Sequence, residues 1–196
     1  MKTVKKYKLS RKFGAPLFEK CQTQKFTLSE SRKSPRIPRR QSEYAKQLLE
    51  KQKLRIIYSL NEKHLKNYVK KALQAENHEQ ELINLLESRL DSVIYQLGLA
   101  KTRRMARQVV SHGHITLNGK KATVPSTHVK TTDIIKIREG SKQNSIFSDL
   151  KDLLTSRPGA KWVEWDSNKS EGKIKTAPSF EEGLVNLSVV FEYYSR

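Results

Sequence analysis

The stretch from Arg89 to Lys121, RLDSVIYQLGLAKTRRMARQVVSHGHITLNGKK, constrains the fold more than any other segment of this chain. Four apolar residues recur at helical spacing and predict a first helix with one buried face: Leu86, Leu90, Val93 and Leu97. Gly98 follows the last of them, where a helix end favours a residue that tolerates positive φ. Thr102 is placed to cap a second helix, which Gly113 ends.

A hairpin follows this pair of helices. Asn118-Gly119 is the preferred pair for a tight turn between two strands, and apolar residues alternate with polar ones before it. We expect the second strand to include Val124 and a further strand to cover residues 133–138. The whole segment is therefore a compact module of two helices on a small antiparallel sheet.

Cationic side chains lie where the second helix starts and where the hairpin turns. Three arginines occupy the first turns of the second helix, where unpaired backbone N–H groups already favour an anion: Arg103, Arg104 and Arg107. Lys120 and Lys121 follow the hairpin turn, and His112 and His114 flank Gly113. Because phosphate is the anion that such a surface fits, the pattern predicts a nucleic-acid binder.

The run RLD…G…TRRMARQVVSHGHITLNGKK resembles the S-four RNA-binding module. Residues 44–72, YAKQLLEKQKLRIIYSLNEKHLKNYVKKA, and the ending VVFEYYSR resemble the bacterial-type family of small-subunit ribosomal protein number four. The order of segments matches over roughly the whole chain. One departure is the linker, where SPRIPRR stands in place of the family's glycine-rich PGQHG-like segment.

The expected fold class is α+β, in three parts. Residues 1–41 form an extended basic arm, residues 42–86 a helical subdomain, and residues 87–175 the S-four module with a C-terminal extension. The resemblance implies that residues 176–196 return to the helical subdomain.

Several elements are expected outside the module. Ser42 caps a helix whose apolar stripe is expected to consist of Ala45, Leu48, Leu49, Gln52, Ile56 and Leu60. Ser59 and Glu62 have the spacing of a capping box before a helix over residues 65–73, and a third helix begins near residue 79. Residues 145–154 form a further helix, WVEW a strand or turn, and residues 187–194 a final strand or a packed tail.

The net charge of the chain limits which kinds of partner it can bind. Lys and Arg number 39 against 20 acids, for a net charge of +19. Residues 1–46 contribute +11 and residues 87–138 contribute +7, whereas residues 139–196 contribute −1. Such a charge repels itself unless an anionic partner neutralises it, and nucleic acid is the simplest partner. No apolar run approaches the roughly 18 residues of a membrane span, and the N-terminus lacks the apolar stretch of a secretory signal.

The sequence offers no metal site, cofactor site or catalytic constellation. Cys21 is the single cysteine, so the zinc-binding cysteine cluster that some members of the resembled family carry is missing. His112 and His114 lack a third ligand at a suitable spacing. Asp91 is expected to pair with Arg89 or a nearby backbone donor rather than act as a base. Tyr44, Tyr58 and Tyr68 are expected in the core more often than against bases.

The resulting prediction is a structural component of the small ribosomal subunit that binds rRNA and nucleates assembly, without enzymatic activity. The resemblance further implies neighbouring ribosomal proteins as partners, contact with mRNA at its entry path, and a contribution to decoding accuracy. The expected location is the cytoplasmic ribosome of a bacterium, or an organellar ribosome. Alternatives are a stand-alone S-four-module factor, an accessory domain of an RNA-modifying enzyme, and a basic membrane-surface protein.

The expected RNA contacts fall in two groups. Those in the module are Arg89, Arg103, Arg104, Arg107, His112, His114, Lys120 and Lys121. Those in the arm and linker are Lys2, Lys5, Lys6, Lys8, Arg11 and Lys12, followed by Arg36, Arg39 and Arg40 near the mRNA. Arg89 stays open between RNA contact and an internal salt bridge.

Overall fold

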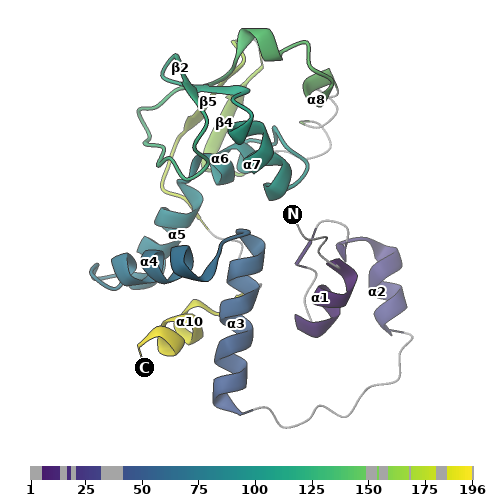
Figure 1. The fold of residues 1–196 in the computed structure, drawn as a ribbon, viewed down its shortest axis with the longest axis vertical. Helices are drawn as coiled ribbons and strands as arrows, with labels where there is room; N and C mark the ends of the chain where they lie inside the picture. The colour runs from purple at the N-terminus through teal and green to yellow at the C-terminus, as the bar shows by residue number, and fades with distance from the viewer. Residues whose placement is uncertain are drawn as a thin grey trace. The chain divides into compact units, whose positions relative to one another are not determined.

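The computed structural model describes residues 6–13, 17–18, 21–31, 42–148, 154, 159–167, 169–179 and 185–195. The chain divides into two compact units, residues 1–70 with 181–196, and residues 71–180 (Figure 1). Helices and one antiparallel sheet occur together, so the predicted α+β class is confirmed. No helix among these described residues is long and apolar enough to cross a membrane.

The first unit is helical. Its helices are α1 (Lys6–Phe13), α2 (Gln24–Ser31), α3 (Glu43–Ile57), α4 (Glu62–Ala72, whose last residues belong to the second unit) and α10 (Leu187–Tyr194). Ser42 caps α3 as expected, because its side chain accepts a hydrogen bond from the Ala45 N–H. The expected capping box of α4 is wrong, since Asn61 Oδ1 accepts from the His64 N–H and Ser59 has a φ of 50°.

The buried face of α3 is not the predicted apolar stripe. Gln47, Lys51 and Leu54 are its buried residues, and Tyr58 follows at the same spacing. Lys51 is only 6% exposed, because its Nζ forms an ion pair with Glu62 at 2.9 Å and lies 4.3 Å from the centre of the Tyr193 ring. Lysine is normally assigned to solvent, so the apolar pattern did not reveal this buried face. The predicted stripe is half-buried instead, apart from Leu60, which is buried.

Residues 187–194 form a helix, so of the two alternatives expected for this segment the strand is wrong and the packed tail is found. Asn186 caps this helix by accepting from the Val189 N–H, and its buried residues recur at helical spacing: Leu187, Val190 and Phe191. This helix, α10, packs beside α3 (Figure 1). Tyr194 donates its hydroxyl to Glu62 at 2.8 Å, and Gln47 donates to Glu192 at 3.0 Å. The C-terminal helix is therefore fixed by packing on α3 and by polar bonds to both α3 and α4.

The second unit holds the module. Its helices are α5 (His78–Glu87), α6 (Leu90–Gln96), α7 (Arg103–Ser111), a 3-10 turn η2 (Glu139–Ser141) and α8 (Ser145–Ser148). The single helix predicted through Leu86 and Leu97 is in fact two, because Arg89 is extended and bridges to His128. Leu90 N–H donates to the Thr127 carbonyl, which holds the break open.

The sheet has the order β2-β1-β3-β5-β4, with every neighbouring pair antiparallel. Its strands are β1 (Ile115–Leu117), β2 (Lys120–Ala122), β3 (Ile135–Ile137), β4 (Val163–Asp166) and β5 (Glu171–Ile174). The WVEW segment thus enters a strand, and β5 was not anticipated. Val124 lies beyond β2 and is 55% exposed, so its predicted place in the second strand is wrong.

The core of this unit lies between the sheet and helices α6 and α7 (Figure 1). Its members come from all these elements and include Val93, Leu97, Val109, Ile115 and Ile135. Because side chains alternate along a strand, Thr116, Lys121 and Lys136 lie on the opposite face of the sheet, across from one another in register. The outer face of the sheet is consequently polar and cationic on its β1–β3 side.

Candidate nucleic-acid interface

The start of α7 is built as expected from the sequence. Thr102 has extended backbone geometry and its hydroxyl accepts from the Met105 N–H at 3.1 Å. Arg103, Arg104 and Arg107 therefore lie in the first two turns, and the buried residues Ala106, Val109 and Val110 fix which way the helix faces. The cap and the apolar stripe together set the direction of all three guanidinium groups.

Arg103 binds an acid inside the module. Its guanidinium donates to Glu87 at 2.7 Å and to the Ser92 hydroxyl at 3.1 Å, and it lies over the Tyr95 ring at 4.6 Å. Glu87 is 1% exposed and also accepts from Gln96. A carboxylate so deeply buried needs such partners, because an unpaired charge in the interior is costly. The ion pair thus has a structural role whatever else Arg103 contacts.

Asp91 holds two further arginines. It accepts two hydrogen bonds from Arg89, at 3.0 and 2.9 Å, and two from Arg107, at 3.0 and 2.8 Å. One of its oxygens also accepts from the Ser92 N–H. The expected pairing of Asp91 with Arg89 is therefore present, and Arg89 itself is 4% exposed. Of the two roles left open for Arg89, the structure gives the salt bridge.

The remaining predicted module cations reach the surface. Lys120 and Lys121 are exposed and Arg104 is partly exposed, and no carboxylate in the described part of the chain forms an ion pair with them. Adjacent residues of a strand point to opposite faces, so Lys120 and Lys121 do not share a surface. Lys121 points to the outer face of the sheet.

Lys121 crosses directly over Gly113. A Cβ at position 113 would overlap the Lys121 Cε, and Gly113 has a φ of +71° that other residues rarely adopt. The glycine thus ends α7 and gives the lysine stem a path across the backbone.

His114 completes this cluster. Its Nδ1 lies 3.0 Å from Ser141 Oγ, which also accepts from Arg138 Nε at 3.4 Å. Partial burial lowers the pKa of His114, and the positive charges of His112, Arg138 and Lys121 lower that pKa further. The ring centres of His112 and His114 are 5.9 Å apart. Four basic side chains therefore lie close together, two from the connection between α7 and β1, one from β2 and one from the residue before η2.

We call His112, His114, Lys121 and Arg138 the Gly113 cluster. The sequence singled out the first three but not Arg138, whose alternation with Ile137 and Lys136 in DIIKIR was the available signal. Arg104 lies at the other end of α7, so the predicted cations are divided between the two ends of this helix. Among the described residues no group of three His, Cys, Asp or Glu side chains is arranged to hold a metal ion.

The arm contributes cations through α1. Lys6, Arg11 and Lys12 lie near aromatic rings of the same segment, with Lys6 over Phe18 at 5.8 Å and Arg11 over Phe26 at 5.9 Å. Lys8 is exposed. Phe13 and Cys21 are buried, so the arm has a small aromatic core. The predicted contacts at Lys2, Lys5, Arg36, Arg39 and Arg40 lie outside the described residues.

Comparison with known proteins agrees with this architecture. The family described as "Ribosomal protein S4/S9 N-terminal domain" matches residues 2–87, and the S4 domain matches residues 88–135. Small ribosomal subunit protein uS4 of Oenococcus oeni is 41% identical over 201 residues, covering 99% of this chain and 97% of the relative. The chain belongs to the uS4 family.

Other uS4 proteins give the same result. Those of Acinetobacter baumannii strain ACICU and of Syntrophomonas wolfei are each 39% identical, over 97% and 95% of this chain and 97% and 94% of theirs. The resemblance seen in the sequence is thereby confirmed. These relatives are ribosomal proteins, so uS4 is a family of ribosome components and not of enzymes.

Proposed function

We propose that this uS4-family chain binds small-subunit rRNA directly, through the Gly113 cluster and Arg104. The Gly113 cluster carries the proposal, because it places Lys121 and Arg138, with which no carboxylate in the described part of the chain forms an ion pair, beside two imidazole rings. Double-helical RNA offers little base readout to side chains, so its phosphates and shape are the features that such a surface recognises.

The arginines of the predicted set have unequal roles in this proposal. Arg89 is a scaffold residue, since both Asp91 bonds hold it inside the module. Arg103 and Arg107 keep their acid partners and contact RNA at most with a remaining edge of the guanidinium group. Lys120 reaches RNA from the other side of the hairpin. Lys6, Lys8, Arg11 and Lys12 of α1 supply a further contact from the arm.

The more specific parts of the proposal, which concern assembly, location, mRNA and decoding, rest on membership of the uS4 family. The chain nucleates small-subunit assembly beside neighbouring ribosomal proteins, in the cytoplasmic ribosome of a bacterium. Its linker, with Arg36, Arg39 and Arg40, lies at the mRNA entry path, and the protein contributes to decoding accuracy. A match spanning almost the full length of uS4 relatives supports a ribosomal component over a stand-alone factor.

Binding of an rRNA fragment to a variant that combines Arg104→Gln and Lys121→Gln tests the proposal. Loss of two phosphate contacts is expected to weaken binding by about 2–4 kcal/mol. The matched control removes the same charge through Lys46→Gln and Lys53→Gln, since those lysines already pair with Glu43 and Glu50 at 2.7 Å. If the two variants bound the rRNA fragment with equal affinity, Arg104 and Lys121 would not be part of the RNA interface.

A further inference from the structure

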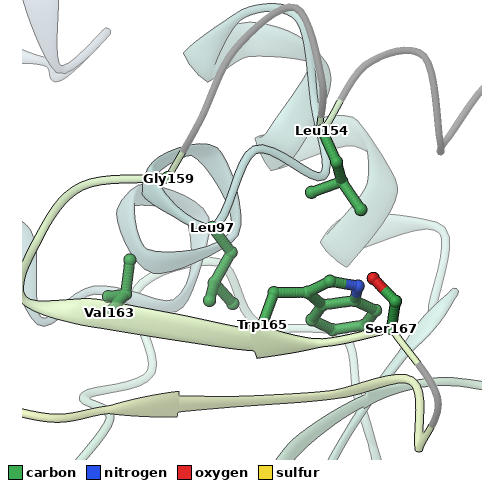
Figure 2. A pocket seen from close by; sticks show the side chains of 6 residues that line it. All are labelled: Leu97, Leu154, Gly159, Val163, Trp165 and Ser167. Atoms are coloured by element: carbon green, nitrogen blue, oxygen red, sulfur yellow. The ribbon is translucent and has the colours of Figure 1, made fainter.

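A small cavity opens beside the edge strand β4, away from the Gly113 cluster. It has a volume of about 230 Å³ and is lined by Leu97, Leu154, Gly159, Val163, Trp165 and Ser167. Figure 2 shows the indole of Trp165 on one side of this cavity and the side chains of Leu97 and Leu154 around it, with the Ser167 hydroxyl on the side of the indole nitrogen. An aromatic ring thus faces aliphatic groups and has a polar group at its edge.

The Trp165 ring packs over Gly172 of the neighbouring strand β5. Gly172 stands opposite Trp165 in the sheet register, and a Cβ there would meet the Leu97 Cδ1 at 2.7 Å and the Trp165 Cε3 at 3.2 Å. Leu97 and Trp165 consequently pack over a position without a side chain. A ring fixed in this way offers its face to a ligand with little loss of side-chain freedom.

Two lysines lie close in sequence to the ends of the cavity lining. Lys161 is two residues from Gly159 and Lys169 is two residues from Ser167. Both are exposed, and no carboxylate in the described part of the chain forms an ion pair with either. The cavity is thus lined mainly by apolar side chains, and two exposed lysines lie within two residues of its lining in the sequence.

We propose that this cavity takes one unstacked nucleobase of RNA, which stacks on the face of Trp165, while Lys161 and Lys169 meet the adjoining phosphates. Every base has a π-face, so stacking on an aromatic side chain tolerates different sequences, and single-stranded segments are where bases are available. The inference rests on the proposed RNA-binding function and adds to it a site that recognises a base rather than the phosphate chain.

Tryptophan fluorescence of the full chain tests this site. The chain has two tryptophans, and Trp162 is buried away from solvent. A change in emission when a ligand enters the cavity therefore reports on Trp165. A hexamer of adenylate is expected to quench this emission saturably, whereas an abasic hexamer with the same phosphates is not. Both Trp165→Phe and Trp165→Val should lack the quenching, and Trp165→Val should bind hexaadenylate about five- to one-hundred-fold more weakly than the unaltered chain.

Three outcomes would overturn the inference. The abasic hexamer quenches as well as hexaadenylate, or the Trp165→Val variant, folded by circular dichroism, binds both hexamers as the unaltered chain does. In the third, hexaadenylate leaves the emission unchanged while the chain still binds an rRNA fragment. That result retains the proposed RNA-binding function and excludes base stacking on Trp165.

Discussion

Replacing Asp91 by asparagine is expected to destabilise the second unit strongly. The substitution keeps the shape of the side chain but removes the charge that accepts four hydrogen bonds from Arg89 and Arg107. Breaking a buried ion pair by removing one partner costs about 3–5 kcal/mol, because the other charge stays buried and unpaired. The Arg89 side chain is 5% exposed and cannot reach water, whereas Arg107 at 26% can turn outward.

The structure therefore places the loss near the lower end of that range, at about 3 kcal/mol for Asp91→Asn. Urea denaturation followed by circular dichroism measures this loss, and the midpoint should fall without a change in slope. Glu164→Gln is the matched control, since Glu164 and Lys175 form an ion pair at 3.0 Å with both side chains more than half exposed. Such surface pairs contribute about 0–1 kcal/mol. If both variants lose the same small amount, the carboxylate does not hold the arginines as described.

Three other perturbations address separate features. Lys51→Gln should lower the free energy of unfolding of the first unit by about 1–2 kcal/mol, because it breaks the bond to Glu62, and thermal denaturation measures this loss. Gly113→Ala should cost about 1–2 kcal/mol in stability through its positive φ, and it should also weaken RNA binding by displacing Lys121, as a filter assay would show. The lowered pKa of His114 means that the unfolded chain binds the proton more readily, so stability should fall as pH drops below about 6.5, and His114→Gln should flatten that fall in denaturation at pH 5 to 7.5.

The sequence predicts well where apolar periodicity and local backbone chemistry agree. Thr102 caps α7, and Asn118 and Gly119 both have the positive φ that a tight turn needs. Leu90, Val93 and Leu97 are all buried as their spacing predicts. In each case the signal lies within a few residues of its consequence.

Prediction fails where a distant partner decides burial or conformation. Lys51 is buried because Tyr193 and Glu62 meet it from other parts of the chain, and no local pattern of α3 reveals them. The ion pair of Arg103 was not predicted, because its acid partner, Glu87, lies 16 residues away in the sequence. The break at Arg89 depends on backbone bonds to residues near His128.

The central claim is that cationic groups around Gly113 hold RNA phosphates. The most direct measurement is the salt dependence of rRNA-fragment binding for the unaltered chain and for a variant with Lys121→Gln and Arg138→Gln. Each lost phosphate contact reduces the slope of log affinity against log salt by about 0.7–0.9, so the variant should be shallower by about 1.4–1.8. An unchanged slope in a folded variant would contradict the account, because it would mean that these side chains release no counterions from the RNA.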